Sequence, residues 1–313
     1  MPNRLASKSQ GGRHCRTGVD RLEARAKRGA AQTAGDALST NTILDPSMTD
    51  TAAPTAGPLQ GNVLFYNRPE PLSVEVHGKL GLRRIDKPFA FAAAAQAVPL
   101  TVTEFTLAAL SYPIIFAGDR HQPLAVTGVA GDANMFLQPN GYFEVGVYVP
   151  AYIRRYPFVL ANDDANQQHI VCIDRDAAML GDLPDLPFFD PAGQPTDYTK
   201  NCIQFCNDYE IELRRTESFI ALLTELDLFE TRKTTFTPTL ADGTPGQPQD
   251  VAEYFAVSEE KLKALPDDKL RNLFDTGALA QIYAHLTSLA GWDRMLAIAM
   301  ARQNPGAQPA NLN

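Results

Sequence analysis

The sequence has few cysteines and no long apolar run, and each shortage excludes a class of protein. Only four cysteines occur in 313 residues, and they do not form the two close pairs of a structural zinc site. No stretch of about 18 consecutive apolar residues is present, which excludes a membrane-spanning helix. A hydrophobic content of 44% and a mean hydropathy of −0.20 instead predict a soluble chain with a substantial core.

Several common catalytic motifs are also missing. The chain has no G-x-S-x-G, no G-x-G-x-x-G and no G-x-x-x-x-G-K-[ST], the signatures of α/β-hydrolases, dinucleotide sites and P-loops. None of the five histidines is followed two residues later by Asp or Glu, and no two histidines have helical spacing. We therefore predict no metal and no cofactor, and an enzyme becomes less expected than a binding protein.

Charge divides the chain into a basic leader and an acidic body. Residues 1–47 hold eight Lys and Arg against four Asp and Glu, whereas the whole chain has a net charge of −8. Binding to a nucleic-acid backbone needs a positive surface, so nucleic acid is not an expected partner.

The first residues are poor in large apolar side chains and carry no apolar segment of a secretory signal. We expect a disordered leader over residues 1–61, a natural start at Met48, and a disordered tail over residues 304–313. The remaining residues, 62–303, are expected to form one domain located in the cytoplasm.

Residues 62–175 are typical of a mainly β region with one or two helices. Alternation of Leu72, Val74 and Val76 predicts a strand, and residues 101–110 predict a short helix capped by Thr101 or Thr103. Further strands are expected over these segments: 113–117, 123–131, 142–149 and 169–175.

Residues 176–303 are expected to be mainly helical and to pack on the β region. Apolar residues from Tyr198 to Leu223 recur every three or four positions, which predicts a long helix over about 195–229. Two strands are expected over 234–240 and 250–258. Helices should follow over 259–265 (capped by Ser258), over 267–277 and over 278–302. The second of them is either stopped by Gly277 or runs on past it. The predicted fold class is α+β.

The segment AYIRRYPFVL, residues 151–160, contains two adjacent arginines. Pro150 suits the start of a helix and Pro157 disfavours its continuation, so a single helical turn is expected. Arg154 and Arg155 would then project about 100° apart. Either arginine could pair with an internal carboxylate or could bind an anionic ligand or partner.

The candidate binding residues are therefore Tyr112, Arg154, Arg155, Tyr156 and His285. His285 also suits a hydrogen-bonded position at the edge of the last helix, and Trp292 suits a packing anchor. His121 follows Asp119 by two residues, which could form an acid–base pair or a polar loop.

Several blocks of this sequence together resemble the SapC family of bacterial proteins. The blocks are VPLTVTEFTLAALSYPIIF, NMFLQPNGYFEVGVYVPAYIRRYPFVL, HIVCIDRD, FFDPAGQPTDY and YFAVSEEKLKALPDDKLRNLFDTGALAQIYAHLTSLAGWDRML. They span roughly residues 62–300. The family is named for a gene associated with surface-layer export, and its relatives in proteobacteria are often encoded near TonB-dependent receptors and flavin-dependent halogenase-like proteins. The resemblance implies no catalytic residues.

Two hypotheses follow. The first is a non-catalytic accessory protein that binds a protein partner in surface-layer or outer-membrane processes, through an exposed apolar or arginine-aromatic patch. The alternative is an enzyme, or the partner of a halogenase-like enzyme, acting on a small-molecule ligand. That alternative predicts a closed pocket in which Tyr112, Arg154 and Arg155 meet one of His121, His169 or His285.

Overall fold

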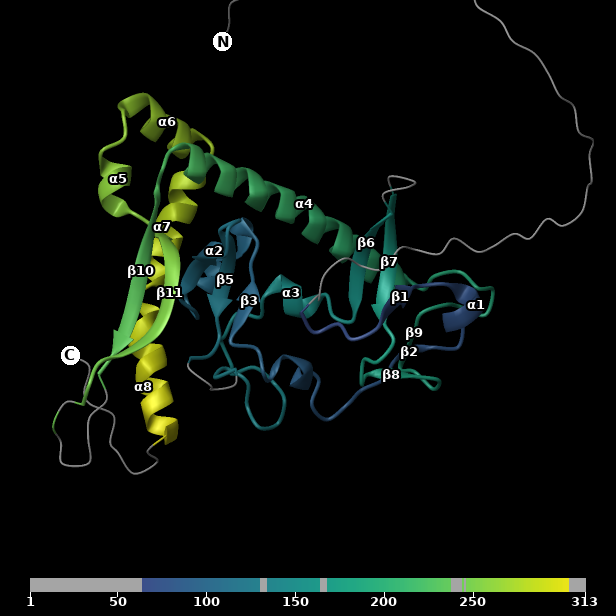
Figure 1. Ribbon diagram of the computed structural model, residues 1–313. Helices are drawn as coiled ribbons and strands as arrows, with labels where there is room; N and C mark the ends of the chain where they lie inside the picture. Colours follow the sequence, from purple (N-terminus) through teal and green to yellow (C-terminus); the bar gives the residue numbers. More distant parts are fainter. Residues whose placement is uncertain (1–63, 130–133, 164–167, 238–243, 245, 304–313) are drawn as a thin grey trace, which may run out of the picture. The chain divides into compact units, whose positions relative to one another are not determined.

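The structure, a computed structural model, describes residues 64–129, 134–163, 168–237, 244 and 246–303 (Figure 1). All of them belong to one compact unit of the chain. The expected leader with Met48 and the expected tail over 304–313 lie outside the described residues. Helices and sheets are both prominent, with the helices concentrated toward the C-terminus, and the α+β prediction is confirmed.

The largest sheet has five antiparallel strands in the order β10-β11-β4-β5-β3. Its β10–β11 hairpin comes from the C-terminal half, and β11 joins β4 where Phe255 pairs with Phe116. This one sheet therefore connects residues from both halves of the sequence. Its strands are β3 (Ala97–Pro99), β4 (Ile114–Ala117), β5 (Gln122–Val126), β10 (Phe229–Phe236) and β11 (Gln249–Val257).

Two smaller antiparallel sheets have three strands each, in the orders β1-β7-β6 and β8-β2-β9. At the centre of the second, a Cβ atom on Gly81 would collide with the carbonyl oxygen of Leu186, so the close approach of these strands requires glycine. The strands are β1 (Pro69–Pro71), β2 (Gly81–Leu82), β6 (Phe158–Asp163), β7 (Gln168–Asp174), β8 (Leu180–Gly181) and β9 (Leu186–Pro187).

The long helix predicted near residues 195–229 is confirmed as α4 (Asp197–Glu225). Thr196 caps its N-terminus, because the Thr196 side chain accepts a hydrogen bond from the Thr199 N–H. In the described part of the chain, no helix is long and apolar enough to cross a membrane. Two 3-10 turns cover Ala90–Ala92 and Val102–Glu104. The other helices are α1 (Val74–His77), α2 (Phe105–Ala108), α3 (Ala151–Arg154), α5 (Glu259–Lys263), α6 (Asp267–Asp275), α7 (Ala278–Ser288) and α8 (Gly291–Gln303).

Helix α4 contributes to two hydrophobic cores. Tyr209, Phe219 and Leu223 enter the larger core, which extends from Ala92 to Ala299 and includes side chains from the five-stranded sheet. Cys206 enters a second core that is built on β6, β7 and the β2 sheet. The apolar stripe read from the sequence is therefore divided between both cores.

The strand predicted from Leu72, Val74 and Val76 is wrong. Ser73 accepts from the Val76 N–H at 3.4 Å and caps α1, and Val76 is 63% exposed. The side-chain cap at Ser73 thus favours a helical turn, although the sequence alternates as in a strand and no neighbouring strand of the described residues pairs with α1.

The strand predicted over residues 142–149 is also wrong, apart from an isolated bridge between Leu137 and Phe143. Its backbone is held by side chains instead of a neighbouring strand. The Tyr148 N–H donates to Ser111 Oγ at 3.1 Å, and the Tyr148 carbonyl accepts from the Tyr112 hydroxyl at 2.6 Å.

The single helix predicted over 278–302 is two helices, with a break between Ser288 and Gly291. At the break, Gly291 lies close to the ring of Pro113, where a Cβ atom would be 3.3 Å from Pro113 Cδ. Trp292 follows immediately and stacks on Tyr254 with ring centroids 5.6 Å apart, so its expected packing role is confirmed.

A buried carboxylate joins the α2 region to α3. Glu104 Oε2 accepts from the N–H and hydroxyl of Thr101, and Glu104 Oε1 accepts from the Tyr148 hydroxyl at 2.9 Å and the Ala151 N–H at 2.7 Å. Four donors compensate for the burial of this charge. The Thr101 cap expected from the sequence is confirmed as one half of this capping box.

His285 is fully buried and joins α7 to two strands. Its Nδ1–H donates to the Ile114 carbonyl at 2.9 Å, and its Nε2 accepts from the Val257 N–H at 3.1 Å. Nε2 can accept from Val257 only when it is unprotonated, so this bond needs the neutral ring. Burial accordingly lowers the pKa of His285 from 6.5 to about 4.

This arrangement predicts a pH-dependent contribution to stability. Because the folded pKa lies below the unfolded one, the contribution is complete above about pH 6.5 and is lost as the pH falls to about 4. A shift of this size corresponds to roughly 3 kcal/mol. Urea unfolding across that range should show the difference between wild type and His285→Gln shrinking by about this amount toward low pH.

The same substitution at exposed His169 measures the effect of losing an imidazole that lies outside the core. The prediction is contradicted if the free energies of unfolding of wild type and His285→Gln differ by the same amount at pH 7 and at pH 4. The neutral, doubly hydrogen-bonded ring would then make no pH-dependent contribution to stability.

Candidate arginine-aromatic site

The two adjacent arginines lie at the end of α3, the single turn predicted after Pro150. The Arg154 N–H donates to the Pro150 carbonyl at 3.1 Å, and β6 begins at Phe158. Arg154 is exposed, whereas Arg155 is only 7% exposed. The predicted divergence of the two side chains therefore places one in solvent and one in the interior.

Arg155 lies in a cage of three tyrosines, Tyr66, Tyr152 and Tyr209, called here the tyrosine cage. Its guanidinium carbon is 4.3 Å from the Tyr152 ring centroid, 4.4 Å from that of Tyr209 and 5.9 Å from that of Tyr66. Such contacts are worth about 2 kcal/mol or more when desolvated. The cage thus joins α3, α4 and the segment before β1 around one cation.

In the described part of the chain, the charge of Arg155 has one neighbouring counter-charge, Glu210, whose Oε1 is 3.9 Å from Arg155 Nη1. Within the described residues, the buried Nε of Arg155 has no hydrogen-bond partner. The internal carboxylate that the sequence analysis allowed for is therefore that of Glu210, at a distance close to the upper limit for an ion pair. The aromatic rings make most of the close contacts with the guanidinium.

Arg154 projects over Phe205, with the guanidinium carbon 5.2 Å from the ring centroid. Its Nε donates to the Val149 carbonyl at 3.0 Å and its Nη2 donates to the Tyr148 hydroxyl at 3.1 Å. Across the described ranges, no carboxylate pairs with this guanidinium. Its remaining N–H groups are free to meet an anion.

A shallow groove of about 170 Å³ runs beside the two arginines, called here the arginine groove. Helix α4 forms one wall with side chains from successive turns of the predicted stripe. The lining residues are Arg154, Arg155, Tyr156, Phe158, Tyr198, Asn201, Cys202 and Phe205.

The acids that line the arginine groove are all held in their protonated forms. Burial raises the pKa of Tyr156 and Tyr198 above the ordinary tyrosine value, with further contributions from Asp174 and Cys202 respectively. Burial also raises the pKa of Cys202, although its contact with Tyr198 opposes the shift. At neutral pH the groove therefore combines neutral acids with two permanent positive charges.

The other predicted residues occupy separate environments. Tyr112 is fully buried and reaches the site only through Tyr148, to whose carbonyl its hydroxyl donates. Burial raises the Tyr112 pKa above its usual range. Tyr156 lines the groove, donates to Asp174 Oδ2 at 2.9 Å and stacks on Phe91 at 4.0 Å.

None of the four histidines in the described residues lines the arginine groove. His285 is hydrogen-bonded to β4 and β11. The ring of His121 stacks on that of Phe229, with centroids 4.1 Å apart, and His169 Nε2 lies 3.2 Å from Arg214 Nη2. The contacts of His285 share no residue with those of Arg155. The pocket expected for the enzymatic alternative, in which an imidazole meets both arginines, is not formed by the described residues.

The sequence prediction missed the tyrosines of the cage and other contributors to the site, among them Tyr66, Tyr148 and Glu104. The T-x-x-E spacing of Thr101 and Glu104 is a capping-box signal that could have located the carboxylate. No local signal connects Tyr66 with Arg155, because the pair is formed only when the segment before β1 packs against α3. In the described part of the chain, no group of three His, Cys, Asp or Glu side chains is arranged to hold a metal.

The same conservative change at the two arginines should have different effects. Arg155→Lys replaces a planar cation in the tyrosine cage by a compact ammonium and should lower the free energy of unfolding by about 2 kcal/mol. Arg154→Lys, at an exposed position, should change it by less than about 0.5 kcal/mol. Chemical denaturation of both variants checks this, and equal losses would show that the cage contributes no special stability.

Comparison with known proteins bears directly on the resemblance noted in the sequence. The family model SapC matches residues 72–295, a range that contains α3, α4 and the tyrosine-cage residues Tyr152 and Tyr209. No match was found among curated proteins or among solved structures. Because the family match covers well over half of the sequence, the chain belongs to the SapC family.

Proposed function

We propose that this protein is a non-catalytic, cytoplasmic accessory protein that binds a partner protein through the arginine groove. The observation that carries the proposal is the exposed Arg154 guanidinium, which lies over Phe205 and has no carboxylate partner among the described residues. An acidic side chain of a partner would complete its hydrogen bonding.

The protonation states at the groove favour binding over proton transfer. A general acid or base works best with a pKa near the operating pH. Tyr156, Tyr198 and Cys202 all have raised pKa values, and both arginines remain charged. This combination supplies fixed electrostatic recognition, and it gives the enzymatic alternative no specific support.

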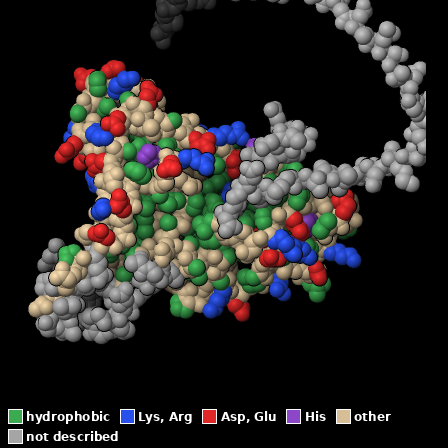
Figure 2. All heavy atoms as spheres, in the orientation of Figure 1, with side chains coloured by type: hydrophobic (Ala, Val, Ile, Leu, Met, Phe, Trp, Pro, Cys, Tyr) green, Lys and Arg blue, Asp and Glu red, His purple; other side chains and the backbone are tan. Residues whose placement is uncertain are grey.

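An apolar surface gives further support. Figure 2 shows hydrophobic side chains gathered on one face, in the region where Figure 1 places α2, β3 and β5. Leu107 of α2 is 54% exposed, and Leu110, which follows the end of α2, is 78% exposed. Exposed apolar patches rimmed by charge are typical of protein-binding surfaces.

The family suggests where the partner belongs. The family is named for a gene associated with surface-layer export, and its proteobacterial relatives are often encoded near TonB-dependent receptors. We therefore propose a partner in surface-layer or outer-membrane processes. The competing proposal, association with a flavin-dependent halogenase-like enzyme, predicts a different partner and is separated by the same experiment.

Affinity capture with the full chain should test the binding surface. Wild-type bait should enrich a surface-layer or outer-membrane protein, and Arg154→Glu should reduce that enrichment about tenfold or more because it reverses the charge of the groove. Lys269→Glu, the same charge reversal at an exposed position on α6, is the matched control and should retain the partner.

Equal capture by wild type and Arg154→Glu would contradict the proposal, as would capture of no partner from cells that express the protein. Recovery of a flavoprotein whose turnover changes when this chain is added would replace the accessory role with the enzyme-partner role.

A further inference from the structure

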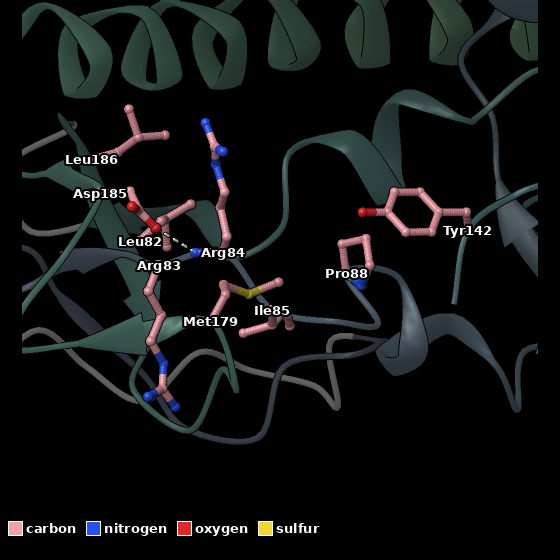
Figure 3. Close-up of a pocket in the computed structure, with 9 residues that line it drawn as sticks. All are labelled: Leu82, Arg83, Arg84, Ile85, Pro88, Tyr142, Met179, Asp185 and Leu186. Carbon is pink, nitrogen blue, oxygen red and sulfur yellow. Dashed lines mark hydrogen bonds between the residues drawn. The ribbon is translucent and has the colours of Figure 1, made fainter. Parts of the chain in front are cut away.

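A second and larger groove lies beside β2, and it is called here the β2 groove (Figure 3). Its volume is about 440 Å³, within the range of pockets that hold small molecules. It shares no lining residue with the arginine groove, so it is a separate site. Strand β2, which lies between β8 and β9, contributes Leu82 to the lining, and β9 contributes Leu186.

The floor of the β2 groove is apolar. Leu82, Ile85 and Met179 line it and belong to or pack against the second hydrophobic core, and Leu186 adds a side chain that is 44% exposed. Figure 3 shows Met179 and Ile85 side by side between the Leu186 end and the Pro88 end. An aliphatic chain laid along this floor would extend the core and remove apolar surface from water.

The charges at the groove favour an anion. Arg83 and Arg84 are both exposed, and the one acid among the lining residues, Asp185, uses its Oδ2 to accept from the Arg84 N–H at 2.7 Å. Two guanidinium groups and one carboxylate leave a net positive lining. A cationic ligand would meet repulsion there, whereas a carboxylate would meet an available donor.

The two arginines differ in availability. Arg83 Nη2 contacts the Ala178 carbonyl at 3.4 Å, and Figure 3 shows its guanidinium directed away from that of Arg84. In the part of the chain that the structure describes, the Arg84 guanidinium has no hydrogen bond and no ion pair. Arg84 is therefore the donor that a ligand in the groove could engage.

We infer that the β2 groove binds a free, medium-chain aliphatic carboxylate. The chain lies over Met179 and Ile85 toward Pro88, and the carboxylate accepts hydrogen bonds from the Arg84 guanidinium. Planar, bidentate pairing of arginine with carboxylate gives the head-group preference, and the apolar floor gives the preference for an aliphatic body. This site adds a small-molecule ligand to the partner binding proposed above.

Isothermal titration of the full chain with octanoate, octan-1-ol and octylammonium tests both parts of the inference. Octanoate should bind at least about tenfold more tightly than octan-1-ol, and octylammonium should bind least. Arg84→Gln should remove about tenfold of the octanoate affinity. Arg83→Gln, the matched neighbour, should leave the affinity within about twofold.

Leu186→Asp tests the apolar floor and should weaken octanoate binding. The fold should tolerate this change, because Leu186 is exposed. Thermal melting of each variant verifies that it is folded. The inference is overturned if octanoate shows no binding, if octan-1-ol binds equally well, or if Arg83→Gln and Arg84→Gln lose affinity equally.

Discussion

The burial of Arg155 among three tyrosines is the interaction on which the candidate site depends. Removing a guanidinium from water costs several kcal/mol unless nearby groups compensate. Among the described residues, the one carboxylate paired with Arg155 is that of Glu210, 3.9 Å away. Compensation therefore falls largely to the faces of Tyr152 and Tyr209. Because these rings come from α3 and α4, the requirement to surround one cation fixes the short turn against the long helix.

This constraint explains why adjacent arginines have different roles. A single helical turn directs consecutive side chains about 100° apart, so when Arg155 enters the tyrosine cage, Arg154 must project over Phe205. The result is a charged groove beside α4. The apolar floor of the β2 groove packs on the second hydrophobic core, and α4 contributes Cys206 to that same core. Burial of Arg155 thus leaves Arg154 as an exposed cation beside α4.

The sequence predicted those features that depend on local pattern. The stripe from Tyr198 to Leu223 identified α4, and Pro150 with Pro157 identified the single turn of α3. It failed where side chains satisfy the backbone: Ser73 converts an alternating segment into α1, and Ser111 and Tyr112 hold Tyr148 outside any sheet. The partners of Arg155 were beyond reach because Tyr66 and Tyr209 lie far from it in sequence. Likewise, nothing local shows that Arg84 would remain unpaired beside an apolar floor.

The central claim is that Arg155 is held by the rings around it, and a double-mutant cycle between Arg155 and Tyr209 measures this directly. The free energies of unfolding of Arg155→Met, Tyr209→Leu and the double variant should reveal a coupling of about 1–2 kcal/mol: the loss in the double variant should be smaller than the sum of the two single losses by that amount. Strict additivity of the two losses would contradict the account, because it would mean that the cation and the ring stabilise the fold independently.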